Sequence, residues 1–210
     1  MKIKWLGQAA FVIKNNQNLV TDPFNPLVGR LPKDLTAAAV TVSHTHLDHN
    51  YTQGVGGGPQ IINQAGDFTV GDFEIKGVST FHDNANGAKR GINIVFTIRV
   101  DGLNLCHLGD LGHVLTEAQL KEIGPVDILM IPVGGHFTIG PSETVQIINQ
   151  IKPKVVLPMH YKPNGSFMPW PLANVSDFIK ELGWKVQEVE ELEIDSKNID
   201  SYKNQIIVFE

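Results

Sequence analysis

The chain has 210 residues and a mass of 23.1 kDa, which predicts one domain over residues 1–210, because single hydrophobic cores stop growing only near ~250–300 residues. Hydrophobic residues make up 42% of the chain, which is a globular composition, and a net charge of −5 without a Lys/Arg run argues against non-specific binding to the nucleic-acid backbone. A single cysteine excludes a disulfide framework, and the lack of a long apolar run argues against a membrane span or signal peptide, so a soluble cytoplasmic protein is expected.

The first half of the chain consists mostly of short alternating or β-branched runs that predict strands. The run 37–43 is apolar and β-branched, which is typical of a strand buried on both faces, and it leads directly into His44. The glycines of 54–58 predict either a mobile flap at a cleft or a plain connector. The expected strands are residues 2–6, 10–13, 18–21, 37–43, 60–63, 68–70 and 73–80.

The second half alternates strand and helix patterns, which indicates a layered α/β domain with helices covering sheets. Thr116 is the expected N-cap of the first helix, and Gly124-Pro125 ends it. The expected strands are residues 91–100, 103–108, 127–132, 155–158, 184–189 and 205–209. The expected helices are residues 116–123, 141–151 and 172–182.

The segment from Ser43 to His49 carries the densest set of metal-ligating side chains. In an extended segment His44 and His46 point the same way, so both imidazoles can reach one ion. Asp48 and His49 come where we expect the chain to turn into a helix, so they can aim at a neighbouring point. Imidazole and carboxylate ligands suit Zn²⁺, and they also suit Mn²⁺ or Fe²⁺. The segment therefore predicts a metal site at the end of a buried strand.

The pattern His44-x-His46-x-Asp48-His49 resembles the signature of the metallo-β-lactamase superfamily. That family places a His, an Asp and a last His at later strand ends, and His82, Asp110 and His160 stand there in this order. The resemblance covers nearly the whole chain, and its details are similar to a small prokaryotic branch of metal-dependent hydrolases related to the ascorbate-6-phosphate lactonases. It implies an α/β (α+β) fold, a four-layer αβ/βα sandwich with the metals at one edge.

The family pattern also implies two divalent metal ions, most simply Zn²⁺. Two ions ~3.5–4 Å apart need an anionic bridge, and they lower the pKa of a shared water so that hydroxide is available near neutral pH. Asp110 would be that bridge, Asp48 could orient the hydroxide or carry its proton, and Asp22 would accept a ring N–H and orient a ligand histidine. The implied ligands are His44, His46 and His82 for one ion, and Asp48, His49 and His160 for the other.

His107 competes with His82 as a ligand, and strand alternation favours His82. Between Leu103 and Asp110, alternation places His107 and Asp110 on opposite faces, about 10 Å apart along the strand. We therefore expect His107 to be a hydrogen-bonded, partly buried imidazole beneath the site. Cys106 is expected to be a small buried hydrophobic residue.

Further residues are substrate candidates with plainer alternatives. His113 and His136 either line the cleft or are loop residues near it. Arg90, next to Lys89, either pairs with an anionic substrate group or is a solvated turn charge. An aromatic and methionine cluster either forms an apolar substrate wall or packs in the core. Its members are Phe137, Tyr161, Phe167, Met168 and Trp170.

The predicted reaction is hydrolysis of a lactone, ester or phosphoester bond of a small anionic metabolite. Redox relatives carry a Glu where His46 stands and add a flavin domain, for which this chain has no room. A nuclease or phosphodiesterase is a weaker alternative, because the stretch from His49 to His82 is short for an RNA-gripping arm. A non-catalytic metal- or ligand-binding protein on the same scaffold is the third alternative. A small-molecule substrate is the expected partner, with no membrane, and a homo-oligomer is left open.

Overall fold

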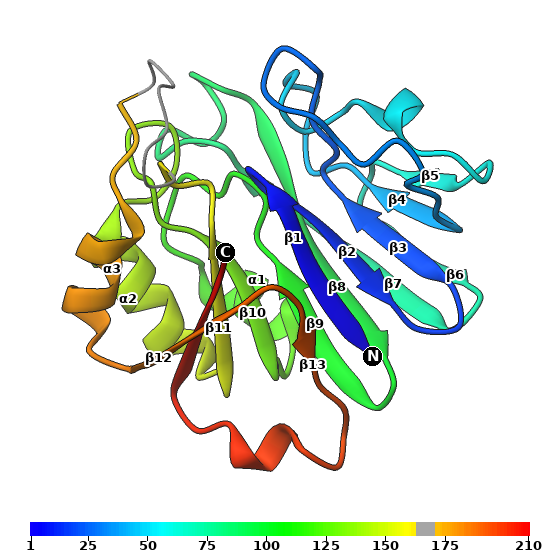
Figure 1. The fold of residues 1–210 in the computed structure, drawn as a ribbon. Coiled ribbons are helices and arrows are strands. Elements are labelled where there is room, and N and C mark those ends of the chain that lie inside the picture. The colour runs from blue at the N-terminus through cyan, green and yellow to red at the C-terminus, as the bar shows by residue number, and fades with distance from the viewer. Residues whose placement is uncertain (163–170) are drawn as a thin grey trace.

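The chain folds into two β-sheets that pack face to face, as the computed structural model describes for residues 1–162 and 171–210 (Figure 1). The first sheet has the strand order β13-β1-β2-β3-β4-β5; its N-terminal strands pair antiparallel, and β3, β4 and β5 run parallel. Its strands are β1 (Lys2–Gly7), β2 (Ala10–Lys14), β3 (Asn18–Thr21), β4 (Ala39–Thr41), β5 (Gln60–Ile62) and β13 (Leu192–Glu193).

The second sheet has the order β12-β14-β11-β10-β9-β8-β7-β6. Antiparallel hairpins join β6 to β9, and parallel pairing continues from β9 through β10, β11 and β14 to β12. Its strands are β6 (Gly66–Val70), β7 (Phe73–Phe81), β8 (Ile92–Val100), β9 (Leu103–His107), β10 (Ile128–Pro132), β11 (Val155–Met159), β12 (Lys185–Val189) and β14 (Gln205–Phe209). The late strand 205–209 thus joins the second sheet, inside it rather than at its edge.

The main hydrophobic core lies between the two sheets, where alternation along the strands directs apolar side chains inward. Phe11 from the first sheet and Phe96 and Leu105 from the second belong to this core and are fully buried. Cys106, the neighbour of Leu105, belongs to the core on the opposite face of the second sheet. The predicted alternation of β9 and the burial of Cys106 are therefore confirmed.

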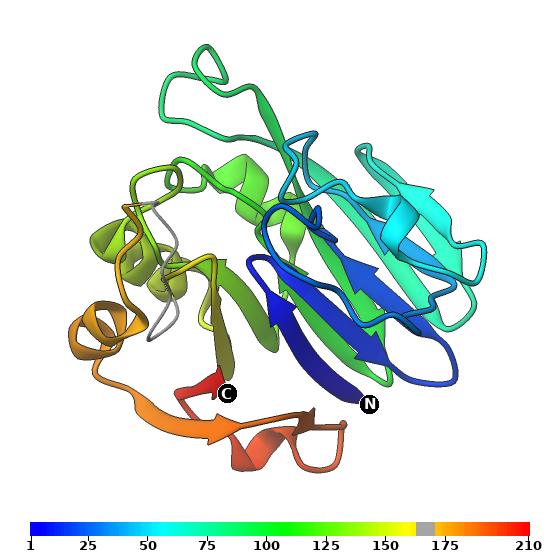
Figure 2. The same cartoon turned by 45° about the horizontal axis from the view of Figure 1, so that its top comes forward.

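Three α-helices of the described chain cover the outer face of the second sheet: α1 (Glu117–Ile123), α2 (Pro141–Ile151) and α3 (Val175–Leu182) (Figure 2). Ile147 and Phe178 are their fully buried contacts in this layer. Thr116 caps α1 as predicted, through a capping box with Gln119. The third helix begins at Val175 rather than at residue 172, because the backbone of Ala173 pairs with strand-end loops instead of helical partners.

Loops and the short 3₁₀ helix η1 (Thr52–Gly54) cover the outer face of the first sheet, over a small core that includes Val20 and Val40. The two-sheet sandwich is confirmed, whereas this outer layer holds no α-helix among the described residues. The glycine-rich segment is a connector: Gly56 N–H donates to Leu35 O (2.9 Å), and its carbonyl accepts from Ala37 (3.1 Å). A second 3₁₀ helix, η2 (Ile199–Ser201), precedes β14. No helix in the described residues has the length and apolarity needed to cross a membrane.

Candidate metal centre

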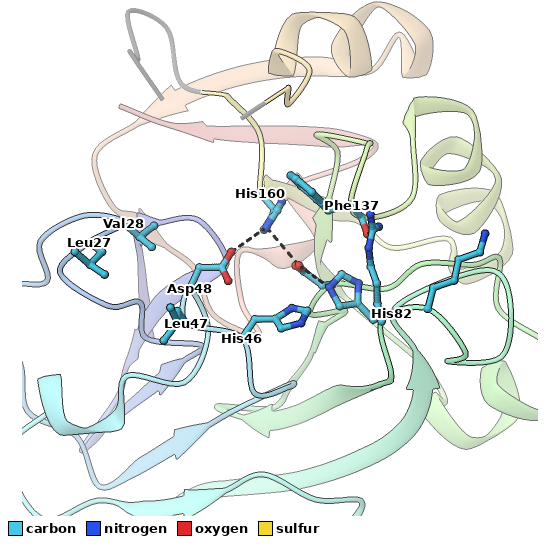
Figure 3. Close-up of a pocket in the computed structure, with 11 residues that line it drawn as sticks. Leu27, Val28, His46, Leu47, Asp48, His82, Phe137 and His160 are labelled. Carbon is cyan, nitrogen blue, oxygen red and sulfur yellow. Dashed lines mark hydrogen bonds and ion pairs between the residues drawn. The ribbon is translucent and has the colours of Figure 1, made fainter. Parts of the chain in front are cut away.

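Four strand ends converge at one edge of the sandwich. Because β8 is antiparallel to both β7 and β9, and β11 is parallel to β9 through β10, the strands β7, β9 and β11 all end at that edge. His82 follows β7, Asp110 follows β9 and His160 follows β11. His44 and His46 approach the same point from the end of β4 in the facing sheet, and Figure 3 shows His46 beside Asp48 and His82.

The loop after β4 remains in turns, so the helix expected at Asp48 and His49 is wrong. The N–H of His49 donates to the carbonyl of His46 (3.0 Å), which closes a single turn. The carbonyl of Leu47, which a helix would pair within itself, accepts instead from Asn25 N–H (3.0 Å). Pairing with the segment after β3 therefore replaces helical pairing in this loop.

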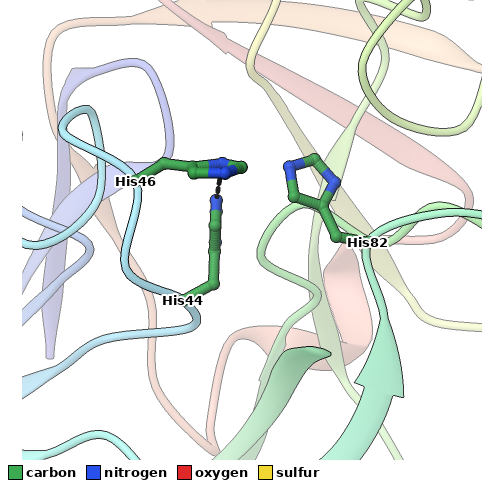
Figure 4. A group of neighbouring side chains, drawn as sticks. All are labelled: His44, His46 and His82. Atoms are coloured by element: carbon green, nitrogen blue, oxygen red, sulfur yellow. Dashed lines mark hydrogen bonds between the residues drawn. The ribbon is translucent and has the colours of Figure 1, made fainter. Parts of the chain in front are cut away.

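His44, His46 and His82 form the first cluster (Figure 4). One ring nitrogen from each lies within 4.8 Å of those of the other two, and His44 Nε2 lies 3.0 Å from His46 Nδ1. His44 and His82 are buried, whereas His46 is exposed to the cleft. Three imidazoles that converge on one point are a donor set suited to Zn²⁺ and similar divalent ions.

Asp48, His49 and His160 form the second cluster. Asp48 Oδ2 lies 3.4 Å from His49 Nε2 and 3.6 Å from His160 Nε2. Both rings are buried, and the Asp48 side chain remains 23% exposed, so it is the carboxylate that faces the cleft.

Asp110 lies between the two clusters. Its Oδ2 is 3.5 Å from His82 Nε2 in the first cluster, and 3.3 Å and 3.4 Å from the Nε2 atoms of His49 and His160 in the second. Its backbone N–H donates to the buried amide oxygen of Asn93 (2.9 Å), which fixes the loop after β9. A single carboxylate thus reaches both clusters, as a bridge must.

The hydrogen-bond inventory of the site fits metal ions. Several buried polar atoms there have no hydrogen-bond partner, although such an atom costs about 1–3 kcal/mol when unpaired. The unpaired atoms are His49 Nε2, His82 Nδ1, both ring nitrogens of His160 and Asp110 Oδ1. Among them, the Nε2 atoms of His49 and His160 lie 3.3 Å and 3.4 Å from Asp110 Oδ2, in the space between the two clusters, where cations would satisfy them.

Asp22 supports the ligands from behind. Its Oδ2 lies 2.8 Å from His49 Nδ1, and its two oxygens accept from Ser43 N–H (2.7 Å) and Ser43 Oγ (2.5 Å). Ser43 Oγ in turn lies 3.0 Å from His44 Nδ1. Because Asp22 accepts the proton of His49 Nδ1, the Nε2 lone pair of His49 is directed into the site.

Close backbone contacts hold the strand-end loops together, and two glycines allow them. A Cβ on Gly112 would lie 2.3 Å from the backbone nitrogen of Asp83, next to His82. A Cβ on Gly134 would lie 2.1 Å from the carbonyl oxygen of His160. Side chains at either position would therefore displace a candidate ligand.

Burial and the neighbouring charges act in opposite directions on the pKa values of the carboxyl and imidazole groups of the site. Burial disfavours the ionised form of Asp48 and Asp110, but the neighbouring imidazoles outweigh it and hold the pKa of both carboxyls well below its usual range. Burial lowers the pKa of His44 to about 3, which keeps that ring neutral. For His49 and His160, burial is outweighed by Asp110 and the other nearby carboxylates, which raise the pKa of both rings.

The competing histidines lie outside both clusters. His107 is fully buried beneath the site, with Nε2 2.8 Å from Ala9 O and Nδ1 accepting from Gly109 N–H (3.2 Å). His113 accepts at Nε2 from Phe81 N–H (3.2 Å), so its Nδ1–H donates to Val114 O (2.9 Å) and the ring does not face the main cavity. His136 is exposed in a side groove.

A cavity of about 570 Å³ opens over the centre, and Arg90 and Phe137 both line it. The Arg90 guanidinium donates through Nη1 to Phe137 O (2.6 Å) and to His136 O (3.3 Å), and it lies over the Phe137 ring. Tyr161, by contrast, is buried and stacks on Trp5, so it packs in the core. Phe167, Met168 and Trp170 lie outside the described residues.

Sequence reasoning missed three supporting residues. Ser43 links Asp22 to His44, Asn93 holds Asp110, and Asp83 accepts four backbone N–H bonds from the loop that carries Arg90. Ser43 and Asp83 adjoin predicted ligands, so adjacency was an available signal. Asn93, the second residue of the mainly apolar strand β8, was a polar residue that could have been found by its expected burial.

Comparison with known proteins gives consistent results. The family model described as the beta-lactamase superfamily domain matches residues 2–160. A UPF0173 metal-dependent hydrolase of Pyrococcus abyssi is 30% identical, over 92% of this chain and 100% of that protein. A crystal structure from Thermotoga maritima, named as a candidate Zn-dependent hydrolase of the metallo-beta-lactamase superfamily, is 40% identical with a TM-score of 0.82, covering 99% of this chain and 98% of that one. A metallo hydrolase from Ignicoccus hospitalis, at 21% identity and a TM-score of 0.68 over 92% and 99% of the two chains, shares the fold.

Proposed function

This chain belongs to the beta-lactamase superfamily and is a metal-dependent hydrolase, and from that premise we propose that it uses a binuclear metal centre to cleave a lactone, ester or phosphoester bond of a small anionic molecule. His44, His46 and His82 would hold one ion, and Asp48, His49 and His160 the other, with Asp110 between them. Zn²⁺ is the metal that this set of imidazole and carboxylate donors suits best. When bound, two such ions supply an activated water near neutral pH and polarise the oxygen of the electrophile.

Hydrolysis requires that the water be oriented and that the leaving oxygen be protonated. In hydrolysis, the oxygen of water adds to the carbonyl carbon or phosphorus, the bond to the leaving oxygen breaks, and that oxygen takes up a proton. Asp48 is ionised and faces the cleft, so it is placed to accept a hydrogen bond from the water and orient it. Asp110 is buried between the imidazoles of both clusters, so it is placed to hold the two clusters together.

The observation that carries the proposal is the position of Asp110 Oδ2, within 3.5 Å of Nε2 atoms from both clusters. This position supports one centre in which both ions share the Asp110 carboxylate, rather than two independent metal sites. A relation to the ascorbate-6-phosphate lactonases, a cytoplasmic location and the identity of the substrate stay predictions.

The test is a hydrolysis screen on metal-loaded protein with lactones, carboxylate esters and phosphodiesters. We expect turnover of one class, its loss after chelation and its return with added Zn²⁺. Asp110→Asn keeps the side chain's shape but removes the bridging charge, and we expect it to lower kcat by at least a hundredfold. Asp127→Asn is the matched control, because Asp127 directly precedes β10, at the opposite end of that strand from the candidate metal centre, and pairs with Lys154. If the loaded protein turns over none of these classes, a non-catalytic metal-binding role replaces the proposal.

A further inference from the structure

The cavity over the metal centre has two chemically different walls. Figure 3 shows Leu27, Val28 and Leu47 on one side of the candidate ligands and Phe137 on the other. Lys89 and Arg90 lie on the side of Phe137, because these three residues also line the neighbouring side groove and Arg90 Nη1 donates to Phe137 O. The volume of about 570 Å³ is in the range of small-molecule pockets, so one ligand can contact both walls while it lies over the metal ligands.

The side chains of the apolar wall are exposed, and hydrogen bonds to Asn25 fix the backbone that carries them. Leu27 is 86% exposed and Leu47 is 60% exposed, and they are two of the few large hydrophobic side chains that the described residues leave in water. Asn25 positions both: its side-chain oxygen accepts from Leu27 N–H (3.0 Å), and its own N–H donates to Leu47 O (3.0 Å). Exposed leucines that line the mouth of the same pocket are typical of a binding surface for an apolar group.

The opposite wall is cationic and its charge is uncompensated. Neither Lys89 nor Arg90 pairs with a carboxylate anywhere in the described part of the chain. Asp83 fixes the backbone beneath them by accepting from Lys89 N–H (2.9 Å) and Arg90 N–H (2.7 Å). Within the described residues, the hydrogen bonds of the Arg90 side chain use Nη1, so Nε and Nη2 remain for another acceptor.

We propose that the substrate is amphiphilic, with an alkyl or acyl group against Leu27 and Leu47 and a carboxylate or phosphate facing Lys89 and Arg90. The scissile bond lies between these two ends, over Asp110. This assignment rests on the proposed hydrolytic function, which it narrows from small anionic molecules in general to those with an apolar arm on the opposite side of the scissile bond.

The test is calorimetric binding to metal-loaded protein with alkylphosphonates, whose P–C bond is not hydrolysed. Octylphosphonate carries both features, ethylphosphonate lacks the apolar arm, and octylamine lacks the anion. A fully buried methylene gains up to about fourfold in affinity, so we expect octylphosphonate to bind at least tenfold tighter than ethylphosphonate even on a partly open wall. Octylamine should not bind measurably.

Matched variants separate the walls. Leu27→Ser and Leu47→Ser remove exposed side chains, so they should fold normally and weaken octylphosphonate about tenfold while leaving ethylphosphonate unchanged. Lys89→Gln should weaken both phosphonates equally. Val186 is an exposed apolar side chain on β12 away from the cavity, so Val186→Ser should leave the affinity for both phosphonates unchanged.

Equal affinity for the two phosphonates, or octylphosphonate binding that is indifferent to both leucine variants, would overturn the assignment even in an active enzyme. Conversely, the expected chain-length and variant effects in a protein that hydrolyses no ester, lactone or phosphoester would uphold the amphiphilic pocket while the hydrolytic proposal fails.

Discussion

Asp22→Asn tests most directly whether the hydrogen bonds of Asp22 orient the candidate metal ligands. Asp22 is fully buried and accepts three hydrogen bonds, from Ser43 N–H, Ser43 Oγ and His49 Nδ1. Its backbone has a positive φ of 39°, which Asn tolerates as well as Asp does, so the backbone gives no reason for the variant to misfold. The change therefore acts on hydrogen bonding and charge alone.

The amide has one acceptor where the carboxylate has two, so whichever way it turns, an NH₂ group faces a donor. If it faces His49 Nδ1, the ring proton moves to Nε2, and the lone pair that points at the candidate metal is lost. Replacing such a supporting carboxylate typically costs about 10–100-fold in metal affinity, which corresponds to about 1.4–2.7 kcal/mol. We expect the loss to fall on the cluster of Asp48, His49 and His160.

The assay is competition for Zn²⁺ between the protein and a chromophoric chelator, on the wild-type chain, Asp22→Asn and the control Asp127→Asn. The control should lose some thermal stability, because Asn104 N–H and Lys154 lose their carboxylate, but no Zn²⁺ affinity. A folded Asp22→Asn protein that binds both ions within twofold of wild type would refute the reasoning.

Three further predictions follow from the same structure. The pKa values of His49 and His160 are raised in the metal-free protein, so their protons stabilise it below the unfolded pKa of about 6.5, and this stabilisation is lost as pH rises through the raised pKa values. Metal binding becomes stronger over the same range, because the ligand nitrogens lose their protons. The difference in Tm between loaded and metal-free protein should therefore widen from pH 6 to pH 9, and a constant difference would contradict this prediction. Asp83→Asn leaves an NH₂ group facing two of the four backbone donors of the Arg90 loop, so thermal melting should show a Tm lower by several degrees, and phosphonate binding should weaken. Desolvation opposes ionisation of Asp83, but the four backbone N–H bonds outweigh it and lower its pKa to about 2, so the stability advantage of the wild type should disappear as pH falls from about 4 toward 2. Gly112→Ala places a Cβ 2.3 Å from Asp83 N, so it must displace His82 and should lower both Tm and Zn²⁺ stoichiometry; unchanged values in calorimetry and metal analysis would refute the close approach.

Much of the fold was predictable because its strands alternate regularly. The two faces of β9, the capped first helix and the convergence of strand ends all follow from local patterns around Leu105, Thr116 and His44. The turn at Asp48 was not predictable, because its backbone pairs with a segment more than twenty positions earlier in the chain. Among the described residues, loops rather than an α-helix cover the first sheet, and their packing also depends on contacts between distant parts of the chain.

The side chains brought together at the site illustrate the same division. Histidines and aspartates at strand ends are visible in the sequence, and the structure gathers all seven at one edge. Whether Arg90 points at the cavity, and whether Leu47 lines the same cavity as Leu27, depends on long-range contacts made by Asn25 N–H and Phe137 O. No local pattern encodes those contacts.

The measurement that most directly tests the central claim is metal analysis combined with anomalous diffraction on crystals of the Zn²⁺-loaded chain. Two ions per chain, one within coordination distance of His44, His46 and His82 and one within that of Asp48, His49 and His160, with Asp110 touching both, is the predicted result. A single ion after full loading, or ions bound away from Asp110, would contradict a shared binuclear centre.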